Sequence, residues 1–299
     1  MKRVILVLSL FLFISCTSFL EEKATGSLTV DSNLSSMESA EAFANSAYSD
    51  LSGLQNTSFS WGSTSYMMLE FLTGKCNSMV SHSRFEDYKN LTLDSRSSMI
   101  DMWWKNLYYG IAKCNLAIDK LEEFTNIDPS ILSRLKGEVH CLRALYYFYL
   151  VRLYGDVPLI TEVQSSLEDL KLERSPVKTI YDDVIIPDLV LAENSDLPKV
   201  DHTGRVSLGV VKTILTDVYL TYAGYPLEGG KEYFSKAAEK AKEVIDGDFY
   251  YLFDDYGKLR NPINNNQGEN IFQVQMALDK KHNLNIPEFL PYQSGISIY

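Results

Sequence analysis

The first residue with a chemical role to consider is Cys16, whose thiol follows an apolar segment at the amino terminus. Lys2 and Arg3 precede an apolar run from Val4 to Ile14, and Ser15 separates this run from the cysteine. The run is too short to span a bilayer as an anchor, and with the two cations it has the pattern of a secretion signal. A small residue directly before a cysteine is typical of a lipoprotein cleavage site. At such a site the cysteine is diacylated and becomes the new amino terminus.

This pattern predicts that residues 1–15 are a signal peptide and that residues 16–33 are a lipidated tether. Fatty chains such as palmitate would then hold Cys16 to a bacterial membrane, since each buried methylene contributes roughly 0.8 kcal/mol. The alternative is a plain secretory signal in which the cysteine falls by chance. Both alternatives predict that the protein is exported.

A second group of residues with binding chemistry lies between residues 53 and 96, where aromatic rings are interspersed with Ser, Thr, Asn and Gly. The segment shows no helical spacing apart from one short helix at 66–72. Irregular segments of this length are uncommon in compact domains unless they have a function. We therefore expect this aromatic-rich segment to contribute to a binding site.

The cysteines and histidines do not indicate metal or redox chemistry. Cys76, Cys114 and Cys141 are widely separated and form no C-x-x-C pair, and the four histidines form no H-x-x-x-H pair. These spacings predict neither a zinc site nor a disulfide framework, and we expect no cofactor. Cys114 and Cys141 fall within helical patterns, which predicts small buried thiols.

Catalysis by a pair of carboxylates is the enzymatic alternative. Glycoside hydrolysis needs two acids about 5 to 10 Å apart across a cleft. The adjacent acids of this chain are Glu122–Glu123, Asp182–Asp183 and Asp254–Asp255. Neighbouring side chains on a helix point about 100° apart, so these pairs are typical of a solvated face. No nucleophile elbow, phosphate loop or dinucleotide motif is present either, and a glycoside hydrolase is the least favoured function.

The charge balance limits the partners of the protein. The chain of 299 residues has 28 Lys and Arg against 39 Asp and Glu, which gives a net charge of -11. Binding to nucleic acid or to anionic lipid needs a basic stripe that this sequence lacks. We therefore expect no nucleic-acid partner, and contact with the membrane through the lipid anchor.

Helices are the elements that must position these residues, because apolar residues recur at helical spacing along most of the chain. A capping box that starts at Ser35 begins the first helix, and Gly155 ends the longest one. Ser175 and Pro176 begin a helix that Pro187 should bend or split. The predicted helices span 35–51, 66–72, 97–121, 129–154, 175–189, 207–223 and 230–245.

The last two helices have the form of a tetratricopeptide-like pair. Large apolar residues on 207–223 face Tyr233, Phe234 and several alanines on 230–245, which lets the two backbones approach closely. The strict repeat of about 34 residues is absent, so the pattern is a loose version. The sequence also predicts a short strand at 270–274. The fold class is therefore mainly all-α, with tetratricopeptide-like helical repeats and long irregular loops.

Residues 143–160, which read RALYYFYLVRLYGDVPLI, resemble the most recognisable segment of the SusD/RagB family of Bacteroidetes outer-membrane nutrient-binding lipoproteins. The other segments that match this family in the expected order are 103–121, 205–220, 238–252 and 269–272. Members of the family usually continue well past the point at which this chain stops. We therefore expect a SusD-like α-helical domain at 34–299 that is incomplete at its carboxyl end, as a fragment or as a truncated gene product.

The resemblance implies binding rather than chemistry. Proteins of this family lie on the outer face of the outer membrane, close over a TonB-dependent (SusC-like) transporter and present oligosaccharides or peptides to it. A sugar ring offers an apolar face to an aromatic side chain, while polar side chains orient its hydroxyls. The candidate ligand-binding residues in the aromatic-rich segment are Trp61, Tyr66, Asn77, His82, Arg84, Phe85 and Tyr88.

Each of these rings has a structural alternative, which is packing of the segment onto the helical body. Trp103 and Trp104 show the same ambiguity, because at helical spacing one of the two must point inward. A second function also stays open: a non-catalytic helical-repeat scaffold that binds another envelope protein. A large barrel that co-purifies with the lipoprotein would favour nutrient delivery, whereas an assembly factor would favour the scaffold.

The predicted anchor is testable by replacing Cys16. The variant Cys16→Ala should be soluble, because it offers no thiol for acylation. Cell fractionation followed by immunoblotting measures the share of protein in membranes, with Cys76→Ala as the control that stays there. Continued membrane association of the Cys16 variant would contradict lipid anchoring.

Overall fold

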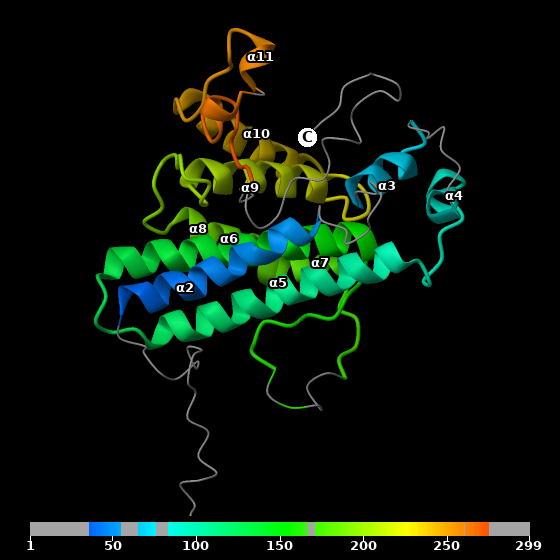
Figure 1. Cartoon of the computed structure of the whole chain (residues 1–299), viewed down its shortest axis with the longest axis horizontal. Coiled ribbons are helices and arrows are strands. Elements are labelled where there is room, and N and C mark those ends of the chain that lie inside the picture. Colours follow the sequence, from blue (N-terminus) through cyan, green and yellow to red (C-terminus); the bar gives the residue numbers. More distant parts are fainter. Residues whose placement is uncertain are drawn as a thin grey trace, which may run out of the picture. The chain divides into compact units, whose positions relative to one another are not determined.

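The computed structural model describes residues 36–54, 65–75, 83–164, 166, 171–259 and 261–274, and within them the fold is built from helices (Figure 1). These described residues contain no strand, although a single β-bridge joins Val157 to Ser175. A π-helical turn, Tyr181–Ile185, links α7 to α8, and two 3-10 turns span Ser49–Leu54 and Pro262–Asn264. The helices in chain order are α2 (Met37–Tyr48), α3 (Ser65–Leu72), α4 (Ser83–Lys89), α5 (Ser98–Glu123), α6 (Pro129–Tyr154), α7 (Val177–Ile180), α8 (Ile186–Glu193), α9 (Leu208–Ala223), α10 (Gly230–Asp246) and α11 (Tyr256–Leu259).

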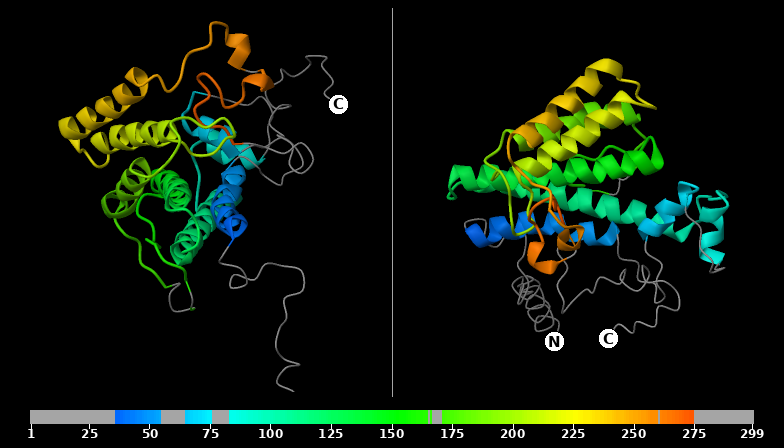
Figure 2. Two further views of the ribbon diagram at one scale, coloured as in Figure 1. Left: turned by 90° about the vertical axis from the view of Figure 1, so that its left-hand side faces the viewer. Right: turned by 90° about the horizontal axis from the view of Figure 1, so that it is seen from above.

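The long helices pack in chain order, as tetratricopeptide-like stacking requires. α5 packs on α6, α6 on α8, α8 on α9 and α9 on α10, while α2 lies against both α5 and α6. Figure 2 shows the successive helices from two further sides. Each helix therefore buries an apolar face on the next, which is how helical repeats are stabilised. The predicted all-α fold class is confirmed.

α6 forms the centre of the core. Most of its side chains between Leu135 and Val151 are buried, whereas Tyr149 is 38% exposed. α5 approaches it closely at Gly110, where a Cβ atom would lie only 2.6 Å from Cζ of the buried Tyr146 ring. Gly155 ends α6 with φ 68°, and its N–H donates to the Val151 carbonyl at 3.0 Å. The predicted glycine stop is therefore confirmed.

The first helix is capped one residue later than predicted. The Ser36 hydroxyl, rather than that of Ser35, accepts a hydrogen bond from the Ser39 N–H at 3.2 Å. A side-chain oxygen at this position satisfies a backbone donor that has no partner within the helix. α9 begins in the same way, where Ser207 Oγ accepts from the Val210 N–H at 3.4 Å.

The segment from 175 to 193 also begins differently from the prediction. Ser175 pairs its backbone in the β-bridge, and Asp156 Oδ1 instead accepts a hydrogen bond from the Val177 N–H at 2.9 Å. Pro187 interrupts the helix as expected: a π-helical turn at Tyr181–Ile185 precedes it, and α8 starts with the proline in its first turn. Proline lacks the amide donor that an uninterrupted α-helix would need.

The α9–α10 pair packs closely, but two of the predicted contacts are wrong. The rings of Tyr222 and Tyr233 stack with their centroids 3.9 Å apart, and Ala237 is buried. Phe234 is 49% exposed, because it follows Tyr233 by one residue and so points about 100° away from the stacked face. Ala238, one of the alanines expected on the contact face, is also exposed. The contacts of Tyr233 and Ala237 agree with the large-small pattern.

The predicted strand at 270–274 is not formed. Asn266 N–H donates to Gln273 Oε1 at 2.7 Å, and Asn270 Nδ2 donates to the Asn264 carbonyl at 3.0 Å. The segment is therefore held by side-chain to backbone bonds and has no strand partner among the described residues. A lone extended segment gains too little from its own contacts to form a sheet.

No helix in the described part of the chain combines the length and apolar composition needed to cross a bilayer. The predicted signal peptide (1–15) and the tether (16–33), with the lipidation candidate Cys16, lie outside the described residues.

A buried polar cluster centred on Asp188 joins α5, α6 and α8. Asp188 accepts hydrogen bonds from Arg143 Nε at 2.7 Å and from Arg143 Nη2 at 2.8 Å, and His140 Nδ1 lies 2.6 Å from Asp188 Oδ1. Arg143 Nη1 also donates to Asn115 Oδ1 at 2.9 Å. Burial alone would raise the pKa of Asp188, but the hydrogen bonds from Arg143 and His140 outweigh burial and hold this pKa below the ordinary value of 3.8. The charged carboxylate therefore fixes α8 against α6.

The Asp188 cluster predicts a pH-dependent loss of stability. Asp188→Asn should lower the free energy of unfolding at pH 7 by about 3–5 kcal/mol, because it leaves Arg143 buried beside a neutral group. A carboxyl with a depressed pKa stabilises the fold above its unfolded pKa of about 3.9 and ceases to do so as the pH falls through the folded value. The difference between wild type and variant should therefore be constant from about pH 5 to 7 and shrink below about pH 4.

Urea unfolding at several pH values measures this difference. Asp217→Asn is the matched control, since the side chain of Asp217 is 59% exposed and lies 3.9 Å from Arg152. That substitution should cost less than about 0.5 kcal/mol. An equal loss for the two variants, or a difference that stays constant down to pH 2, contradicts the role given to Asp188.

Candidate functional site

The described part of the aromatic-rich segment contains α3 and α4 and ends just before α5 (Figure 1). Phe71, Tyr88 and Trp103 make a small buried cluster that also packs against Leu153 and Tyr154 at the end of α6. The short helix predicted at 66–72 is confirmed as α3. The prediction that the rest of 53–96 is irregular is wrong at α4, which is held by the packing of Tyr88 on this cluster.

Among the seven predicted ligand-binding residues, the structure describes the side chain of Tyr88 and the helical backbone of three others. α3 carries Tyr66, and α4 carries Arg84 and Phe85. The candidates outside the described residues are Trp61, Asn77 and His82. The hydrophobic cluster packs α3 and α4, the two helices that carry these three candidates, against α5 and the end of α6.

Tyr88 differs from the other candidates, because its ring is buried. Only 2% of the residue is exposed, and its hydroxyl lies 2.7 Å from Ser97 Oγ. The ring packs with Phe71 and Trp103 and has no open face on which a sugar could stack. We therefore assign Tyr88 to the packing alternative and leave it out of the ligand contacts.

The tryptophan pair behaves as the helical spacing predicts, with one ring inward. Trp103 is 4% exposed, whereas Trp104 is only partly buried. The ring of Trp104 contacts Tyr108 and Tyr154, with centroids 4.9 and 5.0 Å away, and the guanidinium of Arg174 lies 5.6 Å from its centre. Contacts with Tyr108, Tyr154 and Arg174 therefore cover much of the Trp104 ring.

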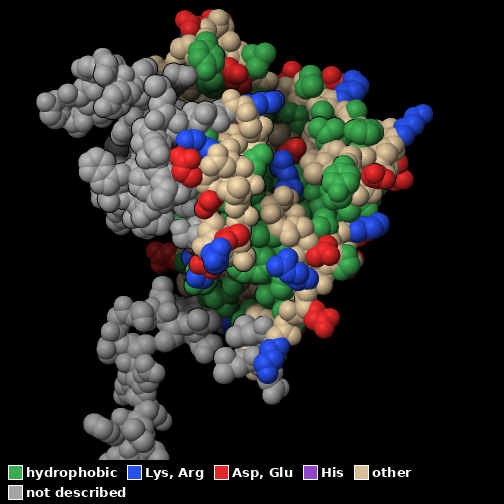
Figure 3. Space-filling model, turned by 90° about the vertical axis from the view of Figure 1, so that its right-hand side faces the viewer, with side chains coloured by type: hydrophobic (Ala, Val, Ile, Leu, Met, Phe, Trp, Pro, Cys, Tyr) green, Lys and Arg blue, Asp and Glu red, His purple; other side chains and the backbone are tan. Residues whose placement is uncertain are grey.

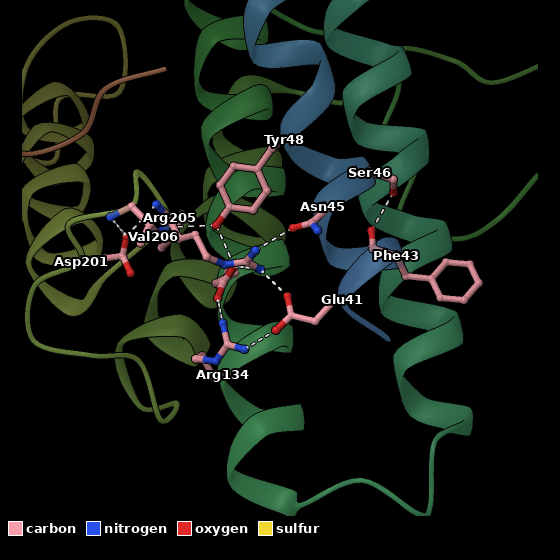
Figure 4. Close-up of polar contacts among 11 residues, drawn as sticks. Glu41, Phe43, Asn45, Ser46, Tyr48, Arg134, Asp201, Arg205 and Val206 are labelled. Carbon is pink, nitrogen blue, oxygen red and sulfur yellow. Dashed lines mark hydrogen bonds and ion pairs between the residues drawn. The ribbon is translucent and has the colours of Figure 1, made fainter. Parts of the chain in front are cut away.

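A second group of polar side chains surrounds the buried carboxylate of Glu138, and Figure 4 labels Glu41, Tyr48, Arg134 and Arg205 among them. Glu138 is 1% exposed and accepts hydrogen bonds from Arg134 Nη1 at 2.6 Å and from Arg205 Nε at 2.9 Å. Arg134 Nη2 also donates to Glu41 at 2.6 Å. Arg205 Nη2 lies 2.6 Å from Glu138 and 3.1 Å from Glu41, as an ion pair rather than an aligned hydrogen bond. The Glu138 network therefore connects α2, α6 and the turn before α9.

Tyr48 attaches the same network to the amino end of α9. Its hydroxyl donates to Glu138 Oε2 at 2.8 Å and accepts from the Val206 N–H at 3.0 Å. Burial, and then the nearby charge of Glu138, raise the pKa of Tyr48 well above its ordinary value, so the hydroxyl keeps its proton. Arg205 Nη1 also donates to Asn45 Oδ1 at 2.6 Å, so Glu41, Asn45 and Tyr48 all tie α2 to this turn.

Asp201 shapes the turn that carries Arg205 (Figure 4). Its Oδ1 accepts hydrogen bonds from the N–H groups of Thr203 at 2.7 Å and Arg205 at 3.0 Å, and from the Thr203 hydroxyl at 2.7 Å. Burial raises the pKa of Asp201, but these hydrogen bonds outweigh it and lower the pKa below 3.8. A charged carboxylate with several donors is a strong turn former.

A pocket of about 170 Å³ lies beside the Glu138 network, and we refer to it as the α2 pocket. Three segments that are distant in sequence form its wall: the end of α2, the turn at 203–205 and the extended residues 272–274. The lining residues are Asn45, Tyr48, Leu51, Thr203, Gly204, Arg205, Phe272, Gln273 and Val274. No pattern in the sequence predicts this pocket. The one available signal was the Arg205–Val206–Ser207 segment, which matched the family pattern without indicating a contact to α2.

The described residues hold no group of three or more His, Cys, Asp or Glu that could bind a metal ion. Burial raises the pKa of the Cys114 and Cys141 thiols, so neither is a reactive thiolate. Each pair of adjacent acids has a member in a lysine ion pair, as a solvated face predicts. These ion pairs are Glu122–Lys136, Glu123–Lys120, Asp182–Lys178 and Asp254–Lys258.

On the face drawn in Figure 3, basic and acidic side chains are interspersed, and they do not form a continuous basic stripe. Binding to a phosphate backbone would need such a stripe.

Comparison with protein families gives a match over residues 18–203. The matching family is described as starch-binding and associating with the outer membrane. This range includes the aromatic-rich segment, α2 to α8 and part of the turn that lines the α2 pocket. The match confirms the resemblance that the sequence motifs indicated.

Individual proteins are similar over most of this chain. SusD-like protein P2 of Formosa agariphila is 26% identical over 266 residues, which cover 84% of this chain and 49% of that protein. A SusD superfamily protein from Parabacteroides distasonis has a crystal structure with 53% identity and a TM-score of 0.84, covering 88% of this chain and 56% of that one. A laminarin-binding SusD-like protein is 26% identical with a TM-score of 0.62, over 75% of this chain and 48% of that one. The chain thus spans about half the length of these relatives.

Proposed function

The chain belongs to the SusD-like family, described as starch-binding and associated with the outer membrane, and on this premise we propose that it binds oligosaccharides at a bacterial cell surface without transforming them. The family match over residues 18–203 is the observation that carries this proposal. The relative named as laminarin-binding supports an oligosaccharide over a peptide as the ligand.

The proposed contacts are made by the aromatic-rich segment. Trp61, Tyr66 and Phe85 would stack on sugar rings, and Asn77, His82 and Arg84 would bond to hydroxyls at the rim. The buried cluster of Phe71, Tyr88 and Trp103 supports this assignment, because it anchors α3 and α4 to the long helices. Binding residues are often carried on loops that a rigid scaffold positions.

The remaining parts of the proposal concern location and partner. Cys16 would carry the lipid anchor, residues 16–33 would be the tether, and residues 34–299 would form the SusD-like domain outside the cell. The ligand would pass to a TonB-dependent transporter in the same membrane. The chain spans about half the length of its relatives. We therefore propose these roles for residues 1–299 as the part of such a protein that this chain supplies.

Oligosaccharide binding is tested by isothermal titration of the wild-type chain with a panel of laminarin, xyloglucan and starch oligosaccharides and of peptides. We expect heat of binding with at least one oligosaccharide. Trp61→Ala and Phe85→Ala should weaken that binding about tenfold, which corresponds to 1.4 kcal/mol of stacking and burial. Tyr256→Ala is the matched control, because Tyr256 is 70% exposed on α11, outside the aromatic-rich segment.

Two outcomes of the titration would contradict different parts of the proposal. No heat with any member of the panel contradicts oligosaccharide and peptide binding. Unchanged affinity in both ring variants, with wild-type melting temperatures, contradicts the assignment of the site to the aromatic-rich segment.

Delivery to a transporter is tested by isolating the tagged protein from membranes of the native host after mild cross-linking. We expect a large TonB-dependent barrel to co-purify, because a donor that passes its ligand on must contact the acceptor. The Cys16→Ala variant is the control and should lose the barrel together with the membrane. Recovery of an envelope assembly factor in place of the barrel would favour the scaffold function.

A further inference from the structure

The α2 pocket has room for one ring and not for an oligosaccharide. Its volume of about 170 Å³ lies below the range of about 300–1,000 Å³ that holds drug-sized ligands. One molecule of liquid water takes about 30 Å³, so the pocket is equivalent to five or six waters. A bound group of this size would be a single small ring or a short side chain.

The wall of the α2 pocket combines apolar surface with hydrogen-bonding groups. Leu51, Phe272 and Val274 supply the apolar part, and the ring of Tyr48 lies beside them. Asn45 is exposed at the end of α2, and its Oδ1 accepts from Arg205. The Asn45 amide NH₂ has no partner among the described residues, so two donors remain available at the pocket.

The charged groups around the pocket all have partners within the protein. Arg205 is the one cation in the wall, and Glu138 and Glu41 pair with it and with Arg134. Asp201 directs its Oδ1 to the backbone and hydroxyl of its own turn. An anionic ligand would meet an arginine that already has two carboxylates, and a cationic ligand would meet no unpaired carboxylate in the wall. The pocket therefore favours an uncharged polar ligand.

The wall is also held in place before any ligand binds. The Tyr48 hydroxyl donates to Glu138, and Asn45 accepts a hydrogen bond from Arg205. Gln273 Oε1 accepts a hydrogen bond from the Asn266 N–H at 2.7 Å. His202 Nδ1 lies 2.9 Å from the Asn266 carbonyl, which ties the loop that precedes 272–274 to the turn before α9. A preformed wall reduces the entropy lost on binding.

We propose that the α2 pocket is a subsite for one uncharged sugar ring, separate from the aromatic-rich segment and contributed by α2, the turn at 203–205 and residues 272–274. The apolar face of the ring would lie against Phe272, and a hydroxyl would accept a hydrogen bond from the Asn45 amide. This inference rests on the proposed function, since it adds a specificity-determining contact for the same class of ligand.

The test is isothermal titration of the full chain with laminaritriose and with maltotriose. Asn45→Ala should weaken the tighter of the two interactions at least threefold, Phe272→Ala at least fivefold, and the double variant at least tenfold. Glu38→Ala on α2 and Phe234→Ala on α10 are the matched controls, because both residues are exposed and neither lines the pocket. Both controls should stay within twofold of wild type.

The outcomes separate this inference from the proposed function. If the wild type binds either sugar and both pocket variants keep its affinity within twofold, the inference is overturned and the proposed function stands. If the wild type binds neither these sugars nor any member of the wider oligosaccharide panel, both are overturned. Asn45 is exposed, so Asn45→Ala gives the result on its own if Phe272→Ala does not fold.

Discussion

The buried carboxylate of Glu138 is the constraint on which the position of the α2 pocket depends. A charge with 1% exposure is tolerated only when it is paired, and Arg134, Arg205 and Tyr48 supply the partners from three different segments. Such pairs add little net stability, but losing one partner costs about 3–5 kcal/mol. α2, α6 and the turn before α9 are therefore held in one arrangement.

The described structure has two parts: the stacked helices α5 to α10, and the segments that line the α2 pocket. α5 to α10 pack in chain order. Within this body, the buried Asp188 pairs α8 with α6, as the buried Glu138 pairs α6 with α2 and with the turn before α9. α2 and the residues around 203–205 and 272–274 are set against that body and carry polar groups that face the pocket. Helical repeats position binding residues in this way without using catalytic chemistry.

The sequence predicted the helices well, because local signals specify them: apolar spacing for α5, α6, α9 and α10, Gly155 for a stop and Pro187 for an interruption. The sequence-based prediction failed where tertiary contacts determine the structure. The pattern predicted Tyr88 as an exposed ring in a polar segment, but it is buried on Trp103. The pattern predicted a strand at 270–274, but this segment has no strand partner among the described residues. The α2 pocket could not be predicted, since Asn45, Arg205 and Phe272 meet only through packing, and no local pattern encodes that contact.

A crystal structure of the protein soaked with a laminarin oligosaccharide tests most directly whether the wall held by Glu138 takes part in glycan binding. We expect electron density for one sugar ring against Phe272, with a hydroxyl within 3.2 Å of the Asn45 amide. We also expect Glu138, Arg134 and Arg205 to keep their positions, because the wall is formed in advance. A bound oligosaccharide that leaves the α2 pocket filled by solvent would contradict the account.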